Sequence, residues 1–276
     1  MPNSRASTPR TASRRSWPHW RASRVSAICG WNTRIRTRAS RWQGWHAASA
    51  TPYARPCASG LLTDKPQPRL ARLHICFLDG DHALLAVADS ADSAPWPLGI
   101  PRLKLLPEAP SRSALKLDEA LLTLLAPDER EALVKPGMRA ADLGAAPGGW
   151  TWVLTRQHVH VTSVDNGPLR EHVLETGLVE HLRADGFHWK PAQALDWMVC
   201  DMVEQPRRVA ERMATWIREG WCRNTIFNLK LPMKKRWDET RLCLDLFEQQ
   251  AEKSLIVRAK QLYHDREEIT VLAMRG

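Results

Sequence analysis

The stretch Ala141-Asp-Leu-Gly-Ala-Ala-Pro-Gly-Gly-Trp-Thr151 has the pattern of a buried strand that runs into a glycine-rich turn and then a helix. Gly144 allows a sharp turn at a place where a side chain would collide. Gly148 and Gly149 are expected to open the next helix with no side chain between the backbone and a ligand. A turn of this kind makes room for a nucleotide-like ligand at the edge of an α/β sheet.

The spacing of the glycines differs from the Gly-x-Gly-x-x-Gly of dinucleotide-binding proteins, which admits a pyrophosphate to a helix N-terminus. Pro147 stiffens this turn, and Asp142 places an acidic residue just before it. Both features suit a cationic ligand without phosphates, such as S-adenosylmethionine. The alternative is an ordinary strand–turn–helix connection that binds nothing.

Positive charge is concentrated at the N-terminus. The chain has 276 residues and a formal net charge of +10, which by itself suggests a nucleic-acid partner. Residues 1–60 contain eleven Arg but no Lys, Asp or Glu, so the remainder of the chain is close to neutral. The excess charge is therefore a property of the N-terminal segment.

This segment is also rich in Ser and Trp and has no sustained period of a helix or a strand. We interpret residues 1–67 as a disordered or aberrant tail, and our first explanation is a GC-rich gene read out of frame. A basic arm that binds RNA through Arg and Trp is an alternative, and a transit peptide is another.

No stretch is long and apolar enough for a membrane span or a secretory signal, so we expect a cytoplasmic protein with no membrane partner. We also expect a monomer. The cysteines form no Cys-x-x-Cys pair and have no matching His spacing, which predicts free, buried thiols and no metal site. They are Cys29, Cys57, Cys76, Cys200, Cys222 and Cys243.

Strand-like and helix-like segments alternate from Met138 onwards, which predicts an α/β fold with a mostly parallel sheet and helices on both faces. The last two strands are joined by a loop and are expected to pair antiparallel. The predicted strands are 139–143, 159–164, 179–183, 196–200, 225–231, 255–259 and 269–274. The predicted helices are 150–156, 169–175, 206–218 and 237–252. Upstream, we expect a hairpin (69–77 with 83–88), a linker (90–97), a helix from the serines at 111 and 113 to about residue 125, and a helix over 128–134.

Three carboxylates follow predicted parallel strands, where a ligand of an open α/β sheet is bound. Asp165 lies about twenty residues after the glycine turn, where an acid can accept hydrogen bonds from both hydroxyls of a ribose. Asp185 could hold an adenine amino group, and Asp201 ends the next strand. Each of them alone could instead cap a turn or a helix.

Lys230 lies near the end of an apolar strand, Thr-Ile-Phe-Asn-Leu-Lys-Leu-Pro, where a charged amine is out of place. A buried lysine needs a paired acid or a lowered pKa, and Asp201 at the end of the preceding strand is the natural partner. The alternative is a lysine that extends to the surface from the end of the strand. Lys116 and Glu268, taken singly, are typical solvated charges.

Several longer motifs carry a resemblance to a known family. They are Ser-Arg-Ser-x-Leu-Lys-Leu, Asp-Leu-Gly-Ala-Ala-Pro-Gly-Gly-Trp, Trp-Met-Val-Cys-Asp-Met, Asn-Leu-Lys-Leu-Pro-Met-Lys-Lys-Arg, Ser-Val-Asp-Asn-Gly-Pro and Gln-Leu-Tyr-His-Asp-Arg-Glu-Glu. From about Leu70 to the C-terminus the chain resembles ribose 2′-O-methyltransferases of the FtsJ-like superfamily. Within it, the chain is most similar to the bacterial family that methylates a cytidine ribose of 23S ribosomal RNA. Residues 1–65 do not look like that family's N-terminal RNA-binding region with its THUMP domain.

The resemblance implies a Rossmann-like, S-adenosylmethionine-dependent methyltransferase domain at 111–276, preceded at 68–110 by the remnant of an N-terminal RNA-binding domain. It implies a catalytic tetrad of Lys116, Asp201, Lys230 and Glu268, with Lys230 as the proton acceptor. It also implies a cofactor site, no metal, and 23S rRNA as the partner. The implied cofactor residues are Ser113, Ala146, Pro147, Gly148, Gly149, Asp165, Asp185 and Asp201.

The chemistry of these residue types agrees with that reading. A ribose hydroxyl is a weak nucleophile, so its proton must leave as the oxygen attacks the sulfonium methyl group. Lys230 would act as the general base, or would steer the hydroxyl if it stays protonated. In-line alignment and the exclusion of water would supply most of the rate. Cations near the site could bind RNA phosphates, and they are Arg102, Lys104, Arg112, Lys234, Lys235 and Arg236.

Other functions remain open from the sequence. A dehydrogenase of the same architecture would need the pyrophosphate glycine spacing, which is missing. A non-catalytic RNA-binding module is supported only by the basic tail. Within the methyltransferase reading, the alternatives are another RNA substrate, or a form with a defective N-terminus that binds cofactor but methylates rRNA poorly. We expect Trp150, Trp152 and Trp197 to lie in the core and not to stack on bases.

Overall fold

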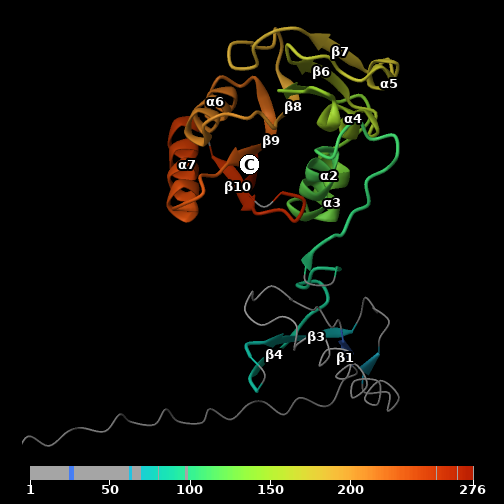
Figure 1. Ribbon diagram of the computed structural model, residues 1–276, viewed down its shortest axis with the longest axis vertical. Helices are drawn as coiled ribbons and strands as arrows, with labels where there is room; N and C mark the ends of the chain where they lie inside the picture. Colours follow the sequence, from blue (N-terminus) through green and yellow to red (C-terminus); the bar gives the residue numbers. More distant parts are fainter. Residues whose placement is uncertain are drawn as a thin grey trace, which may run out of the picture. The chain divides into compact units, whose positions relative to one another are not determined.

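The computed structural model describes residues 25–27, 62–63, 70–79, 81–96, 99–252, 254–265 and 267–275 (Figure 1). The chain divides into two compact units, Met1–Ile100 and Pro101–Gly276, and each is described by itself. The domain boundaries expected after residues 67 and 110 remain predictions.

The first unit contains a small four-stranded sheet in the order β2-β1-β3-β4. Strands β3 (Ala71–Phe77) and β4 (Ala83–Ala88) form the antiparallel hairpin that the sequence predicts. Strand β1 (Val25–Ala27) runs parallel to both β3 and β2 (Leu62–Thr63). The rest of the predicted tail lies outside the described residues.

The second unit is a seven-stranded sheet in the order β10-β11-β9-β8-β5-β6-β7. Strands β5 to β9 are parallel, and β11 pairs antiparallel with both β9 and β10, which confirms the predicted α/β class and the reversed direction of the last strand. The strands are β5 (Arg139–Leu143), β6 (His160–Val164), β7 (Val179–Leu182), β8 (Leu195–Cys200), β9 (Cys222–Lys230), β10 (Leu255–Lys260) and β11 (Glu268–Arg275). The helices are α2 (Ala114–Thr123), α3 (Pro127–Leu133), α4 (Gly149–Thr155), α5 (Glu171–Leu174), α6 (Pro206–Arg218) and α7 (Arg236–Ala251).

Helices cover both faces of this sheet, with α6 and α7 on one face and α2, α3 and α4 on the other (Figure 1). Because successive side chains of a strand point to opposite faces, neighbouring residues belong to different cores. Trp197 packs with the α2 and α4 side, whereas Met198 packs with the α6 and α7 side. Trp150 and Trp152 are also buried, so the expectation that these three tryptophans lie in the core is confirmed.

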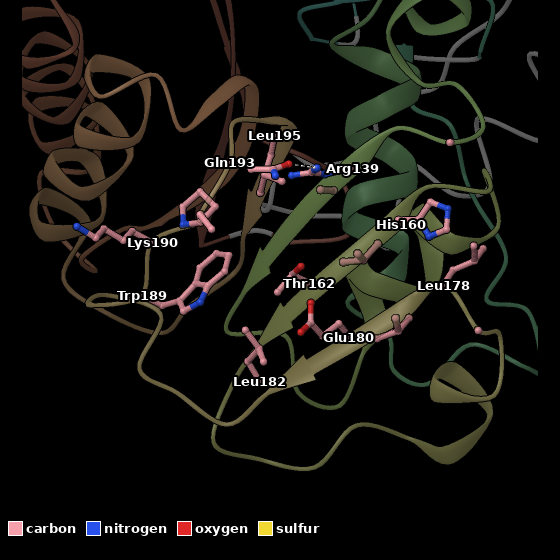
Figure 2. Close-up of a pocket in the computed structure, with 17 residues that line it drawn as sticks. Arg139, His160, Thr162, Leu178, Glu180, Leu182, Trp189, Lys190, Gln193 and Leu195 are labelled. Atoms are coloured by element: carbon pink, nitrogen blue, oxygen red, sulfur yellow. Dashed lines mark hydrogen bonds between the residues drawn. The ribbon is translucent and has the colours of Figure 1, made fainter.

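One stretch of the sheet lacks a helical cover. The connection from β7 to β8 contains no helix, and a groove of about 720 Å³ lies over β5, β6 and β7 (Figure 2). Arg139, His160 and Leu195, which line it, are the first residues of their strands. The groove runs from these amino ends along β6 and β7 as far as Leu182, and none of the residues of the glycine turn or of the tetrad lines it.

The described cysteines are free, and Cys200, Cys222 and Cys243 are buried as expected. Cys76 is exposed, so the expectation of burial is wrong for this residue, which lies in a hairpin whose partner strand β4 is itself largely exposed. Cys29 and Cys57 lie outside the described residues. None of the described helices has the length and apolar character needed to cross a membrane. Within the same residues, no three His, Cys, Asp or Glu side chains are grouped as metal ligands.

Candidate active site

The glycine turn after β5 has the sharp bend that the sequence predicts. Gly144 has a φ of +76°, and a Cβ at this position would collide with the side chain of Met202. Met202 follows Asp201 at the end of β8. The missing side chain therefore lets the loop after β8 approach the turn closely, at the carboxyl edge of the sheet.

Gly149 serves a different purpose from the one expected. A Cβ there would overlap the hydroxyls of Ser113 and Ser111, so the glycine makes room for these serines and not directly for a ligand. The two hydroxyl oxygens lie 2.6 Å apart, and the Ser113 hydroxyl does not cap α2. The indole N–H of Trp150 donates to the carbonyl oxygen of Ser113 at 3.0 Å. The turn and the first turn of α2, which carries Lys116, are thus packed together.

Asp142 does not face the ligand edge, which corrects its expected part in binding a cation. Its side chain is buried, and its carboxylate accepts a hydrogen bond of 2.7 Å from the hydroxyl of Thr151, which also contacts the hydroxyl of Ser163. Burial raises the pKa of Asp142 to about 7, because the hydroxyl contacts only partly offset the loss of water.

Asp165 and Asp185 both close turns, as the simpler sequence interpretation allows. Asp165 accepts from the backbone N–H groups of Ala146 at 3.0 Å and Gly167 at 2.7 Å, which ties the end of β6 directly to the glycine turn. Asp185 accepts from the backbone N–H of Phe187 and contacts the ring of His188, with half of its side chain exposed. A carboxylate offers about four acceptor positions, so both retain capacity for a ligand.

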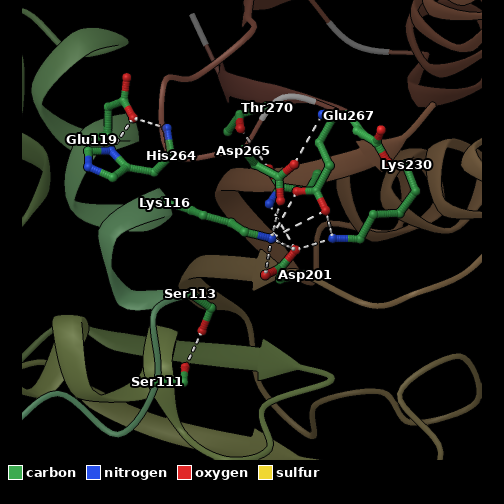
Figure 3. A network of polar contacts seen from close by, with 12 residues as sticks. Ser111, Ser113, Lys116, Glu119, Asp201, Lys230, His264, Asp265, Glu267 and Thr270 are labelled. Carbon is green, nitrogen blue, oxygen red and sulfur yellow. Dashed lines mark hydrogen bonds and ion pairs between the residues drawn. The ribbon is translucent and has the colours of Figure 1, made fainter. Parts of the chain in front are cut away.

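The four residues of the implied tetrad converge from four parts of the fold; Figure 3 labels three of them, Lys116, Asp201 and Lys230. Lys116 comes from the first turn of α2, and Asp201 directly follows β8. Lys230 ends β9 and Glu268 begins β11, and these two positions are opposite each other in the antiparallel pair. The side chains are 7% to 21% exposed, so the cluster is largely buried and still reachable.

Each carboxylate of the tetrad contacts both ammonium groups. Lys116 Nζ lies 3.1 Å from Asp201 Oδ2 and 3.0 Å from Glu268 Oε2. Lys230 Nζ lies 2.6 Å from Asp201 Oδ1, and it also donates to Glu268 Oε1. A buried charge is stabilised only when it is paired and hydrogen-bonded, and this arrangement gives every charge two partners of opposite sign.

Sequence reasoning missed two further members of the cluster. Asp265 Oδ2 lies 2.9 Å from Lys116 Nζ, so three carboxylates surround two ammonium groups. Asn228 donates to Asp201 Oδ1 at 2.9 Å, and the hydroxyl of Thr270 donates to the amide oxygen of Asn228 at 2.7 Å. Asn228 lies two residues before Lys230 on the same strand. Because alternate residues of a strand share a face, the position of Lys230 could have indicated that Asn228 faces the same site. Asp265 lies in a loop, where no repeating sequence pattern indicates which way a side chain points.

A second polar contact fixes the loop that precedes β11 (Figure 3). The buried carboxylate of Glu119 accepts from the backbone N–H groups of Tyr263 at 2.9 Å and His264 at 3.1 Å, and it contacts the His264 ring at 2.6 Å. Glu119 lies three residues after Lys116 and therefore on the same side of α2. One helix thus holds the loop at Glu119 and the charge cluster at Lys116.

The electrostatics of the cluster keep Lys116 charged. Burial disfavours its ammonium form, but the carboxylates of Asp201, Asp265 and Glu268 outweigh burial and raise its pKa. Burial raises the pKa of Glu268, although Lys230 opposes the shift. Burial also opposes ionisation of Asp265, but its contact with Lys116 lowers the pKa overall. Lys116 is therefore a fixed positive charge beside Lys230.

Curated proteins with high identity to this chain share one name. The ribosomal RNA large subunit methyltransferase M of Xanthomonas oryzae pv. oryzae is 96% identical over 218 residues, which are 79% of this chain and 63% of the relative. The protein of that name from Xanthomonas axonopodis pv. citri is 95% identical over 79% of this chain and 62% of its own length. The one from Xanthomonas campestris pv. campestris is 94% identical over 79% and 63%. The chain therefore spans less than two thirds of the length of these relatives.

A family model matches more than half of the chain. The model of the FtsJ-like methyltransferase family covers residues 109–266. The matched segment contains three residues of the implied tetrad, Lys116, Asp201 and Lys230, and it ends just before the fourth, Glu268. The seven-stranded sheet, the glycine turn at its carboxyl edge and this match lead to one conclusion: the chain belongs to the FtsJ-like methyltransferase family.

Proposed function

We propose that the chain transfers a methyl group from S-adenosylmethionine to the 2′-hydroxyl of a cytidine ribose in 23S rRNA. The observation that carries the proposal is the cluster of Lys116, Asp201, Lys230 and Glu268 at the carboxyl edge of the sheet. Family membership and the shared name of the relatives support the same activity.

The residues at the glycine turn fit a cationic nucleoside. The acceptor capacity of Asp165 suits ribose hydroxyls, and its attachment to Ala146 fixes the carboxylate beside the turn. The carboxylate of Asp201 suits a positively charged sulfur nearby. When bound, S-adenosylmethionine supplies a methyl group on a sulfonium, which an oxygen nucleophile can displace. We propose the Ala146–Gly149 turn, Ser113, Asp165, Asp185 and Asp201 as its site.

Within this site the side chains prepare the hydroxyl for attack. For this role Lys230 must first release a proton to solvent; its uncharged amine then accepts the proton of the 2′-hydroxyl as the oxygen bonds to the methyl carbon and the carbon–sulfur bond of the donor breaks. Asp201 and Glu268 stabilise the resulting ammonium. Lys116 stays protonated and balances part of the negative charge of Asp201 and Glu268. Asn228 holds the carboxylate of Asp201 in place, and Asp265 holds the ammonium of Lys116. The main contribution of the chain is a fixed geometry for in-line transfer.

We further propose that residues 111–276 form the methyltransferase domain and that 68–110 are a remnant of an N-terminal RNA-binding domain. The start of the family match at residue 109 and the unit boundary after Ile100 support this division. Because the proposed substrate is ribosomal RNA, we place the activity in the cytoplasm.

Transfer of tritium from labelled S-adenosylmethionine to 23S rRNA tests the proposal. The full chain is expected to label the rRNA, and Lys230→Ala is expected to lose labelling but keep its affinity for S-adenosylmethionine, measured by calorimetry. Lys260→Ala, an exposed lysine at the end of β10, is the matched control and should stay active. An active Lys230→Ala variant would remove Lys230 from the mechanism.

A further inference from the structure

The three most exposed large apolar side chains of the described residues belong to two neighbouring segments, the loop after β8 and the loop from β9 into α7. Val203 is 91%, Met233 is 89% and Trp237 is 71% exposed. The next most exposed large apolar residue of the second unit, Ile256, is 44% exposed. Single exposed apolar residues need no explanation, but three outliers beside one site do.

All three belong to the segments that carry the charge cluster. Val203 follows Asp201 in the loop after β8, and Met233 follows Lys230 in the loop after β9. Trp237 lies in the first turn of α7, at the end of that second loop. Two hydrogen bonds of 2.9 Å from Arg207 to Glu239 join the first turns of α6 and α7, so the two loops leave the sheet side by side.

The loop after β9 is held in a fixed shape. The guanidinium of Arg236 donates to the carbonyl oxygen of Pro232 at 3.2 Å, and it pairs with Glu267 at 3.5 Å. The backbone N–H of Leu231 donates to the carbonyl oxygen of Glu267 at 2.8 Å. Lys235 has a φ of +55°, which is uncommon for a residue with a side chain. Met233 and Trp237 are therefore presented from an ordered segment.

The charges around these residues favour a polyanion. The acids Glu204, Glu239 and Glu267 are each paired with an arginine. Lys234 and Lys235 are exposed, and neither ammonium has an ion pair with a residue that the structure describes. Asp238 is the one nearby acid without an ion pair among those same residues, and it lies in the first turn of α7, where an acid is favoured by the helix dipole.

We infer that Val203, Met233 and Trp237, with Lys234 and Lys235, form the docking surface for single-stranded RNA next to the reacting ribose. Trp237 stacks on a base that flanks the target nucleotide, and the two lysines contact the phosphates. Aromatic rings interleaved with cations bind unpaired strands in this way, because every base has a face to stack and every nucleotide a phosphate. This inference rests on the proposed function, since it assigns how the RNA substrate of the same site is held.

The surface also explains why a ribose of an unpaired nucleotide could reach a largely buried cluster. The tetrad side chains are at most 21% exposed, so the target must leave its stack before its hydroxyl can approach Lys230. A stacking residue beside the entrance stabilises the neighbouring base once the helix is opened. The tryptophans that the sequence singled out lie in the core, whereas Trp237 lies at this entrance.

Steady-state methyl transfer to a 23S rRNA transcript, with the full chain, tests the inference. Trp237→Ala is expected to raise the KM for RNA about tenfold, because loss of one stacked base has effects of this order. The kcat and the affinity for S-adenosylmethionine should change little, and Trp237→Phe should restore most of the affinity for RNA. The double variant Lys234→Gln, Lys235→Gln should weaken binding of a fluorescein-labelled single-stranded RNA and reduce the salt dependence of that binding.

Ile256→Ala, on the outer strand β10, is the matched control and should leave the KM for RNA unchanged. If the wild-type chain methylates the RNA and the Trp237→Ala variant has the same KM for RNA, the inference is overturned and the proposed function stands. A change in oligomeric state on gel filtration, with no change in KM, would assign the surface to a second copy of the chain and would also overturn it. Failure of the wild-type chain to bind or methylate RNA would overturn both proposals.

Discussion

Asp142 and Asp201 are carboxylates at the ends of neighbouring parallel strands, and their surroundings differ in kind. Asp142 is enclosed by the core, with hydroxyl groups as its partners, and its pKa is raised to about 7 by burial. Asp201 lies one position beyond its strand and contacts two ammonium groups and an amide. The register pairs Leu143, next to Asp142, with Cys200, next to Asp201.

The comparison shows that position along the strand decides what a carboxylate can do. A carboxylate inside the strand is surrounded by uncharged groups, and its charge only costs free energy. A carboxylate past the strand end reaches the edge where side chains from several elements meet, so its charge can be balanced. Substitution of Asp142 is therefore expected to change the stability of the fold, whereas substitution of Asp201 is expected to change the rate of methyl transfer.

The largest effect is expected for Asp201→Asn. Both lysines lose a shared counter-charge, and the geometry around Lys230 is disturbed, so methyl transfer should fall by about a hundredfold or more. The reaction is measured as labelled methyl groups in rRNA at saturating cofactor. Asp196→Asn, at the other end of β8, is the control and should retain activity. Activity within twofold of wild type in Asp201→Asn would place the reaction elsewhere.

The next effect is expected for Glu119→Ala. The variant leaves the backbone N–H groups of Tyr263 and His264 without their buried acceptor, which costs roughly 1–3 kcal/mol of unfolding free energy for each unsatisfied group. Urea denaturation measures the loss. The loop that carries Asp265 and leads to Glu268 at the start of β11 is released, so methyl transfer should fall as well. A destabilised variant with undiminished transfer would show that the loop does not need this anchor.

Asp142→Asn tests the other carboxylate through the pH dependence of stability. In the folded chain Asp142 releases its proton only near pH 7, whereas an unfolded aspartate does so near pH 4, so the wild-type fold loses stability as the pH rises between these values. Asparagine does not titrate, and the variant should lose less stability over the same range. Urea unfolding near pH 4 and above pH 7 gives the comparison. Parallel pH profiles of the two proteins would contradict the assigned environment.

The smallest effect is expected for Asp265→Asn. Lys116 keeps two carboxylate partners in this variant, and an ion pair with one partly exposed member contributes about 1 kcal/mol or less, so transfer should fall roughly two- to fivefold. The ratio of kcat values at fixed pH measures it. A loss as large as that of Asp201→Asn would make Asp265 an essential member of the cluster.

Much of this arrangement could be predicted from the sequence, because it follows from periodic patterns and strand ends. The strand 139–143, the helix 206–218 and the antiparallel end of the sheet are observed as predicted. The pairing of Lys230 with Asp201 was predicted because both stand at strand ends, and it is observed. The places of Lys116 and Glu268 in the cluster were implied only by the family resemblance. Their catalytic roles, and those of the cofactor residues, remain predictions.

The rest depends on contacts between loops, which no period reveals. The collision partner of Gly144 is Met202, from the loop after β8, almost sixty residues further along the chain. The groove over β5 to β7 lies where the connection from β7 to β8 contains no helix. A pattern that predicts strands does not show which part of the sheet is left without a helical cover. The exposure of Trp237 could not be distinguished from core packing, since a tryptophan at the start of a helix is compatible with either.

The chemical position of the transferred methyl group tests the central claim most directly. Labelled 23S rRNA from the wild-type reaction is digested to nucleosides and separated by mass spectrometry. The convergent lysines and carboxylates predict a methyl group on the ribose 2′-oxygen, and the family resemblance predicts that the nucleoside is cytidine, so the expected labelled product is 2′-O-methylcytidine. A methyl group on the base, with unmodified ribose, would contradict the assignment of this cluster to a ribose hydroxyl.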